Sequence, residues 1–262
     1  MAEVIGADRI EVIALMLIYG GAGAIQGMVG FGFAILSVPL VAILYGPGAA
    51  VAMNIVVGTA LLAYKSWLQR RDIDRRAVFS FGGATLLFIP LGVLMISVLP
   101  EEPALALIGL FVILVAAGNL VSRHHVRRAA GTPVAFWGLA GISGVLAGAF
   151  SAPGPSAVPY FTARAEHPIT AQANLQLYFL LLGLPVILSH TIAGNVTAAA
   201  LLRAVWFIPV VFAATWTGTR VAVLLPAERL RRMVDGALLA LGIWLVIDNT
   251  HLITRIVERT HT

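Results

Sequence analysis

Cysteine is absent from this chain of 262 residues, and charged residues are scarce. The lack of cysteine excludes disulfides and metal sites built from thiolates. Charged residues make up 11% of the chain, whereas a soluble domain carries roughly 25%. Hydrophobic residues make up 60%, and the mean hydropathy is +0.95. This composition indicates an integral membrane protein and excludes an ordinary soluble domain.

Long apolar stretches fill almost the whole chain. A helix needs about 20 residues to cross the hydrocarbon core of a bilayer, and most of the stretches are close to that length. They occupy residues 11–46, 47–64, 77–99, 103–121, 134–163, 168–189, 199–225 and 230–248. The sequence therefore predicts an all-α, polytopic membrane protein with about eight hydrophobic segments and a single membrane domain.

A glycine-rich motif occurs twice. The first copy reads AGAIQGMVGFGFAILSVP over residues 22–39, and the second reads SGVLAGAFSAPGPSAVP over residues 143–159. Other matches follow in the same order along both halves: Asn54 with Asn174, Gly92 with Gly218, and Leu99-Pro100 with Leu225-Pro226. The order of these matches indicates a duplicated unit.

The duplication sets the expected organisation of the chain. We predict a first transmembrane repeat at residues 1–122, a cytoplasmic connecting loop at 123–133 and a second transmembrane repeat at 134–262. The two repeats together form one membrane domain.

In each pair of equivalent loops, only one of the two halves carries basic residues. Residues 65–76 hold five Lys and Arg, while the matching segment 188–199 holds none; residues 99–103 hold none, while the matching 225–232 hold three. Because basic loops stay in the cytoplasm, this exchange favours repeats of inverted orientation. A parallel arrangement of four plus four spans stays open, because the total charge on each side hardly separates the two.

The first stretch of each half is too long for one straight helix across the membrane. Residues 11–46 would form a helix about 54 Å long, against a hydrocarbon core of about 30 Å. We expect this stretch to fold back near residues 27–32, and the stretch 134–163 to fold back near 151–155. Two breaks of this kind at matching positions point to the substrate site of a transporter.

The signatures GAIQGMVGFGFAILSVP and GVLAGAFSAPGPSAVP, each opening one half of a small helical membrane protein, resemble those of the TauE/SafE family. Members are sulfite and organosulfonate transporters, also called four-toluene sulfonate uptake permeases. The resemblance covers nearly the whole chain. It implies a multi-pass protein of the bacterial inner membrane that moves sulfite, sulfoacetate, isethionate, taurine-related sulfonates or other small anions. It implies no enzymatic activity and no cofactor.

The two breaks supply the first candidate substrate contacts. A broken helix presents free N–H groups and the positive end of its dipole, which can hold an anion without a full charge. We expect such donors near Gly30, Phe31, Gly32, Ser151, Ala152 and Gly154. The alternative is that the glycines only allow close helix packing, which we favour for Gly23 and Gly144.

Polar side chains inside the apolar stretches are further candidates. Asn54 and Asn174 occupy equivalent positions, and an amide can either donate to an oxyanion or clasp two helices. Supporting candidates for substrate binding are Gln26, Gln172, Gln176 and Tyr178. Gln172 and Gln176 are four residues apart and share a helix face.

Four ionisable residues near the ends of spans are candidates for anion attraction or coupling: Lys65, Arg164, His190 and Arg203. Charge within a membrane is a functional hypothesis by default, and histidine titrates near neutral pH. The alternatives are that Lys65 and Arg164 snorkel to the interface, that Arg203 serves only topology, and that His190 is a loop-edge residue.

We therefore expect a secondary transporter of small anions that works by alternating access around a midplane site between the repeats. The expected partners are the anion, the lipid bilayer and a coupling ion, H+ or Na+; the small-residue faces also permit a homodimer. No metal, cofactor or nucleic-acid partner is expected. The rival functions are a membrane scaffold or assembly protein, and an intramembrane enzyme, for which no HExxH motif or paired intramembrane aspartates occur.

Overall fold

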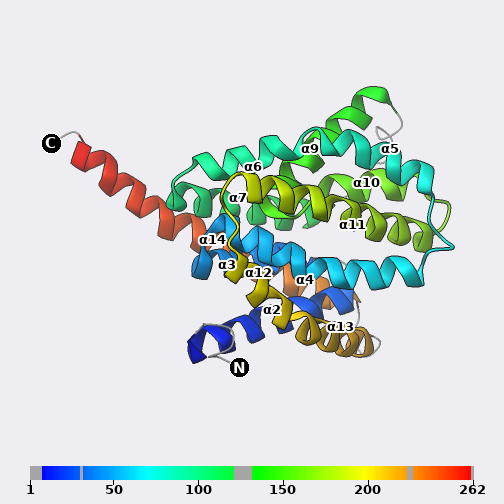
Figure 1. Cartoon of the computed structure of the whole chain (residues 1–262), viewed down its shortest axis with the longest axis horizontal. Helices are drawn as coiled ribbons and strands as arrows, with labels where there is room; N and C mark the ends of the chain where they lie inside the picture. Colours follow the sequence, from blue (N-terminus) through cyan, green and yellow to red (C-terminus); the bar gives the residue numbers. More distant parts are fainter. Residues whose placement is uncertain (1–7, 30–31, 121–131, 223–226, 261–262) are drawn as a thin grey trace.

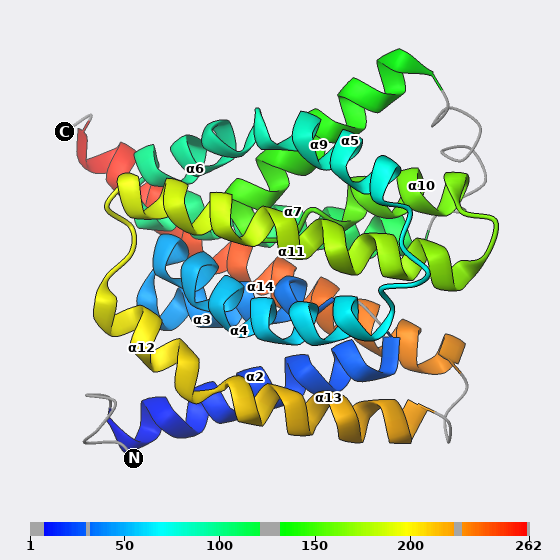
Figure 2. The same ribbon diagram turned by 45° about the vertical axis from the view of Figure 1, so that its right-hand side comes forward.

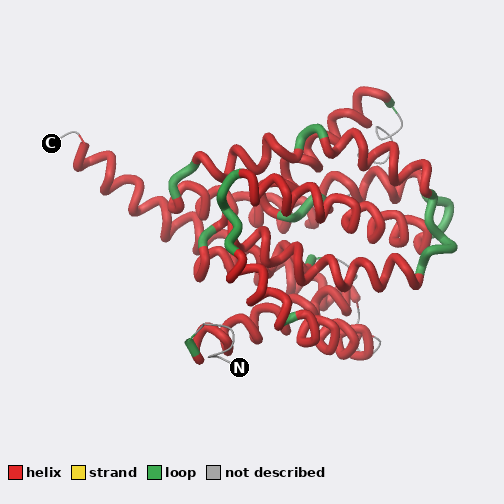
Figure 3. Tube along the Cα trace, in the orientation of Figure 1, coloured by secondary structure: helices red, strands yellow, loops and turns green. Residues whose placement is uncertain are grey.

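The computed structural model describes residues 8–29, 32–120, 132–222 and 227–260, and these residues form helices joined by short loops (Figures 1 and 3). The first half contains α2 (Arg9–Val29), α3 (Phe33–Tyr45), α4 (Pro47–Leu68), α5 (Arg75–Leu86), α6 (Ile89–Val98) and α7 (Glu101–Leu120). The second half contains α9 (Pro133–Phe150), α10 (Gly154–Arg164), α11 (Pro168–Ile192), α12 (Ala198–Trp206), α13 (Ile208–Ala222) and α14 (Ala227–Thr260).

Seven helical segments within the described residues are long and apolar enough to cross a membrane, and α3 is a shorter apolar helix. Two of the seven, Arg75–Val98 and Ala198–Val221, each combine two consecutive helices: α5 with α6, and α12 with α13. Pro90 lies in the first turn of α6, where its missing N–H has no helical partner to lose. The prediction of an all-α polytopic membrane protein is thereby confirmed.

The first long stretch folds back between α2 and α3. α3 begins directly after Gly32, whose φ of +104° lies in the left-handed region that glycine adopts without strain. The hydroxyl of Tyr45, at the end of α3, lies 3.4 Å from a carboxylate oxygen of Glu11 in the first turn of α2. The end of α3 therefore returns to the end of the molecule from which α2 started.

The matching stretch of the second half folds back between α9 and α10. α9 ends at Phe150, Ser151 adopts a left-handed φ of +52°, and α10 begins at Gly154. The rings of Phe136 in α9 and Tyr160 in α10 lie 5.8 Å apart, so α10 returns along α9. Both breaks lie at the positions expected from the length of the apolar stretches.

The helices α4 and α11 cross the centre of the molecule side by side in opposite directions (Figure 1). Gly48 at the start of α4 lies against Asn195 just beyond α11, and Gly183 lies against Thr59 at mid-length. We call the end with residues 193–197 end A, and the end with the loops 69–74 and 165–167 end B. Lys65 and most other described basic residues lie near end B.

Closely packed helix pairs, among them α7 with α14, join the two halves of the chain. α2 packs on α13, and α9 packs on α6, as the lower and upper parts of Figure 2 show. A Cβ atom on Gly27 of α2 would overlap the carbonyl oxygen of Thr215 in α13. A Cβ atom on Gly148 of α9 would likewise overlap the carbonyl oxygen of Ile89 in α6. The expected packing role extends to Gly23, which lies against α13, and to Gly144, which lies against Thr85 of α5 and Phe88 just before α6.

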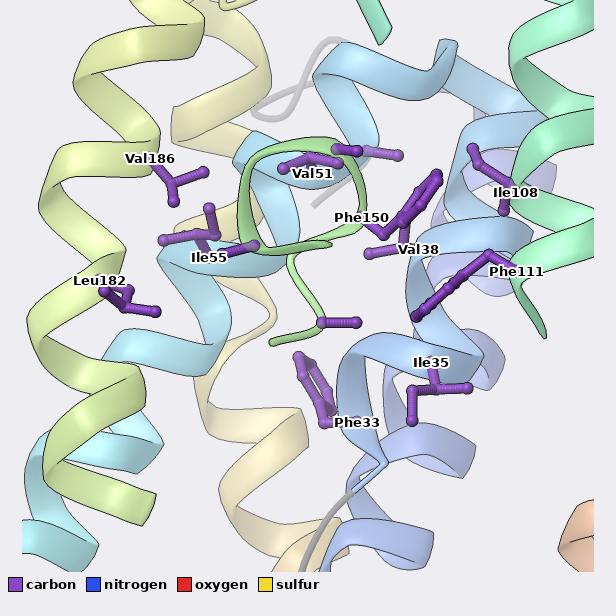
Figure 4. Packing of buried hydrophobic residues seen from close by; sticks show 14 of the residues in the cluster. Phe33, Ile35, Val38, Val51, Ile55, Ile108, Phe111, Phe150, Leu182 and Val186 are labelled. Carbon is purple, nitrogen blue, oxygen red and sulfur yellow. The ribbon is translucent and has the colours of Figure 1, made fainter. Parts of the chain in front are cut away.

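The apolar core surrounds the end of α9 (Figure 4). The rings of Phe111 in α7 and Phe150 in α9 stack with centroids 4.5 Å apart. Val38 of α3 and Val51 of α4 are almost completely buried beside them. This packing fixes the α9–α10 break next to α3 and α4.

Candidate functional site

A cavity of about 110 Å³ lies at the centre of the molecule. Its walls come from the start of α3, the middle of α4, the α9–α10 break and the middle of α11. One water molecule needs only about 10–15 Å³ of cavity volume counted in the same way. A solute of several heavy atoms therefore has room here. The cavity brings the two helix breaks to one place.

The first break presents the start of α3 to the cavity. Phe33 donates its backbone N–H to Oε1 of Gln26 over 3.1 Å, and the Gln26 side chain is 6% exposed. The first N–H groups of a helix lack partners inside the helix, and Gln26 satisfies one of them. Ala34 and Ile35, which follow in the same turn, also line the cavity. The positive end of the α3 dipole therefore faces the cavity.

Asn54 joins the first break to the second. Its side-chain oxygen accepts a hydrogen bond from the hydroxyl of Ser37 in α3, and its nitrogen donates to the hydroxyl of Ser151 over 3.1 Å. The side chain is 3% exposed and lines the cavity. An amide nitrogen carries two hydrogens, and among the described residues Ser151 is the acceptor found for it. No acceptor for the second N–H of Asn54 is found within the described residues.

Hydroxyl groups from several helices hold the second break. The carbonyl oxygen of Pro153 accepts hydrogen bonds from Ser143 over 3.0 Å and from Ser156 over 3.3 Å. The hydroxyl of Tyr178 lies 2.6 Å from that of Ser143 and 3.0 Å from that of Thr85. This buried chain of hydrogen bonds ties α5, α11 and α9 to a residue that lines the cavity.

Half of the predicted substrate-binding residues line the cavity: Gln26, Gly32, Asn54, Ser151, Ala152 and Gly154. Gly30 and Phe31 lie outside the described residues. Tyr178 is fully buried behind the cavity wall.

The remaining predicted polar residues lie on α11 toward end B, outside the cavity lining. Asn174 accepts a hydrogen bond from the backbone N–H of Asp74 over 2.7 Å, which clasps α11 to the start of α5. Gln172 is exposed and accepts a hydrogen bond from Gln69 over 3.4 Å. Gln176 is 2% exposed, and its oxygen has no hydrogen-bond partner within the described part of the chain.

The ionisable candidates surround the cavity at a distance. Arg164 lies over the ring of Tyr160 at 4.8 Å, and Arg203 lies over the ring of Tyr45 at 5.6 Å. Arg203 is therefore near end A, whereas Arg164 is near end B. Lys65 lies on α4, one turn beyond the cavity wall, and is partly buried.

His190 lies fully buried near the end of α11, inside a network of hydrogen bonds. Its Nε2 is 2.7 Å from the carbonyl oxygen of Gly148, and its Nδ1 is 3.1 Å from the side-chain nitrogen of Asn195. That nitrogen also donates to Ser97 over 2.6 Å. With a carbonyl on one side and an amide donor on the other, the ring is assigned as neutral with its hydrogen on Nε2.

Sequence reasoning missed Ser37 and Ser143 as parts of this site. Both lie inside the two motif copies, so membership of the motif was the available signal. A serine in a membrane helix often bonds to its own backbone, and the hydroxyl of Ser37 has the carbonyl oxygen of Phe33, 2.7 Å away, as an alternative acceptor to Asn54. The partners from distant segments become visible only in the fold.

No group of three or more His, Asp or Glu that could hold a metal ion occurs among the residues that the structure describes. The family model described as "Sulfite exporter TauE/SafE" matches residues 15–245. No curated protein and no solved structure matches the chain.

Proposed function

Because the chain belongs to the TauE/SafE family of membrane sulfite exporters, we propose that its central cavity binds sulfite or a small organosulfonate during transport. The observation that carries this proposal is the convergence of neutral donors on one cavity. The start of α3 and the side-chain amide of Asn54 both line it. An oxyanion is the ligand that such donors prefer.

The cavity is suited to an anion that is also partly apolar. None of the described residues that line it carries a charged side chain, and Phe33, Leu182 and Val186 form apolar walls. A fixed charge in the membrane interior is costly, whereas dipoles and amides bind an anion at less cost. The apolar walls favour sulfonates with a short carbon chain, and the size also admits sulfite.

The directions of the helices support inverted repeats. Asn54 in α4 and Asn174 in α11 are equivalent positions in the predicted duplication, and α4 and α11 run antiparallel. Repeats of parallel orientation would give these two helices the same direction. The cavity lies at mid-length of both helices, as alternating access around a midplane site requires.

End B carries most of the described basic residues, which are Lys65, Arg70, Arg71, Arg75, Arg76, Arg164, Arg220 and Arg232. The positive-inside rule then places end B in the cytoplasm of a bacterial inner membrane. End A, with Arg9 and Arg203, faces the opposite side.

The pairs α2–α13 and α6–α9 are the units that we propose to move during alternating access. Their backbones approach so closely at Gly27 and Gly148 that a Cβ atom would not fit. Helices packed in this way shift as one body more readily than they slide past each other. Each moving unit would then contain one helix from each repeat, so neither repeat rocks as a whole.

Thermal unfolding of the purified protein with a panel of anions tests this proposal. At about 100 times its dissociation constant a ligand stabilises a protein by about 2.7 kcal/mol. We expect sulfite or a sulfonate to raise the unfolding temperature of the wild type but not of Asn54→Ala. If only carboxylates stabilised the protein, the proposed substrate class would change from sulfite and sulfonates to carboxylates. No stabilisation by any anion, together with no anion flux in proteoliposomes, would favour the scaffold function instead.

Anion flux under imposed gradients of H+ or Na+ identifies the coupling ion. If the anion flux depends on one of the two gradients and not on the other, that ion is the coupling ion. If the anion is instead converted to a product, an intramembrane enzyme would be favoured.

A further inference from the structure

Lys65 occupies the interior face of α4, directly beyond the cavity. The cavity lining on α4 includes Gly58, Leu61 and Leu62. Lys65 follows Leu61 by four residues and Leu62 by three, and such residues lie one above the other on a helix face. Helical side chains lean toward the N-terminus of their helix, so the stem of Lys65 leans toward these two leucines. Lys65 therefore lies on the same face of α4 as these cavity-lining leucines.

The neighbours of Lys65 argue against a position that faces the lipid. The outer face of this last part of α4 is marked by Tyr64, Trp67 and Leu68, which are 51%, 62% and 61% exposed. Leu61 and Ser66, in contrast, are 3% and 5% exposed. Lys65 is partly buried. A lysine that only snorkels to the interface would lie on the outer face with Tyr64 and Trp67.

The cavity becomes less buried toward Lys65. At the side near end A, Asn54 and Val186 are 3% and 2% exposed. At the side near end B, Leu62 of α4 and Phe179 of α11 are partly exposed. The hydrogen bonds from Ser37 through Asn54 to Ser151 lie on the other side, away from Lys65. The side of the cavity where Lys65 lies thus has two partly exposed lining residues.

Within the described ranges of the chain, no ion pair is found for Lys65. Arg70, two residues beyond the end of α4, instead stacks on Trp67 at 4.8 Å and donates to its carbonyl oxygen over 2.8 Å. Arg70 is exposed and thus directed away from the cavity.

We propose that Lys65 is the cation at the mouth of the cavity that draws the anionic substrate in from end B. This inference rests on the proposed function of the cavity. Positive charge at the mouth of a narrow site with apolar walls raises the local concentration of an anion. The lysine attracts the anion, and the start of α3 and Asn54 hold it. A charge outside the cavity also avoids a buried fixed charge in the transport site.

Initial rates of radiolabelled sulfite uptake test the proposal in inside-out membrane vesicles, whose outer face is end B. We expect Lys65→Gln to raise the KM by about tenfold at low salt, the lower limit of typical steering effects. The difference from wild type should shrink as salt rises, because salt screens the charge. Lys65→Arg should keep a KM close to that of the wild type.

Arg70→Gln is the matched control, since it removes an exposed cation just beyond the same end of α4. Its KM should stay unchanged. Lys65→Met, which keeps an apolar stem, gives a second neutral variant if Lys65→Gln does not fold. The inference is overturned if a folded neutral variant has the KM of the wild type at low salt, or if Arg70→Gln raises the KM equally.

The two proposals fail in different ways. Loss of uptake in Asn54→Ala together with an unchanged KM in Lys65→Gln would keep the cavity as the transport site and remove Lys65 from the mechanism. Absence of sulfite and sulfonate uptake by the wild type would overturn both proposals.

Discussion

The side-chain nitrogen of Asn54 lies 3.1 Å from the hydroxyl of Ser151, although 97 positions separate them in the chain. The hydrogen bond connects the middle of α4 with the left-handed residue that ends α9. Asn54 also accepts a hydrogen bond from Ser37. One amide thus holds both helix breaks against the same cavity, so a ligand that bonds to this amide affects both breaks.

Replacing Asn54 with alanine should abolish stabilisation by the anionic substrate. The change should also lower the free energy of unfolding by about 1–3 kcal/mol, because buried hydroxyls lose their partners. Thermal unfolding with and without sulfite measures both effects. Asn174→Ala is the matched control: it loses the clasp to Asp74 but touches no cavity wall. If Asn174→Ala removed sulfite binding while Asn54→Ala retained it, the substrate site would lie near Asn174 on α11 and not in the central cavity.

Alanine at Gly27 should destabilise the protein by about 1–3 kcal/mol, because its Cβ overlaps the backbone of α13 and over-packing is costly. Gly21→Ala provides the control within the same helix. No atom lies within 4 Å of a Cβ built on Gly21, so this change should be neutral or slightly stabilising. Thermal unfolding in detergent compares the two variants. Equal stability of both would contradict the close packing of α2 on α13.

His190→Ala should lower stability by about 1–3 kcal/mol, since the carbonyl oxygen of Gly148 and the amide of Asn195 lose a buried partner. The KM for sulfite and the pH profile of transport should stay unchanged, because a neutral ring with both nitrogens bonded acts as a clasp. Transport assays at several pH values, together with thermal unfolding, test this prediction. A stable variant whose transport no longer depends on pH would instead assign His190 to proton coupling.

Cysteine labelling should distinguish the two orientations of the repeats. The chain has no cysteine of its own, so each introduced thiol reports a single position. We expect Arg70→Cys and Glu166→Cys to react with an impermeant reagent from the cytoplasmic side, and Ala193→Cys from the opposite side. Labelling of Arg70→Cys and Ala193→Cys from the same side would support parallel repeats.

Length and composition predicted the helical class and the two breaks. The stretches 11–46 and 134–163 are too long for one span, and the structure interrupts both. The glycine spacing at Gly23 and Gly144 predicted close packing, and both residues lie against neighbouring helices. These properties are local, because they depend on the length of a run or on residues within one turn.

The sequence pattern could not predict which residues from distant segments would contact each other. The four-residue spacing placed Gln172 and Gln176 on one face of α11, yet Gln172 is exposed and Gln176 is buried. A helix face has a fixed direction, but what covers each turn of that face depends on other segments. The hydroxyl chain through Tyr178 depends likewise on Thr85 and Ser143.

The close pairing of α2 with α13 has a consequence for how the protein is made. The hydroxyl of Thr215 donates to the carbonyl oxygen of Gly23 across 192 positions. A ribosome that adds about 5–20 residues per second needs roughly 10–40 s to cover that distance. During this time the glycine face of α2 is in the bilayer before α13, its neighbour in the folded protein, has been synthesised. Until α13 is made, the glycine face of α2 must therefore contact lipid or another neighbour in its place.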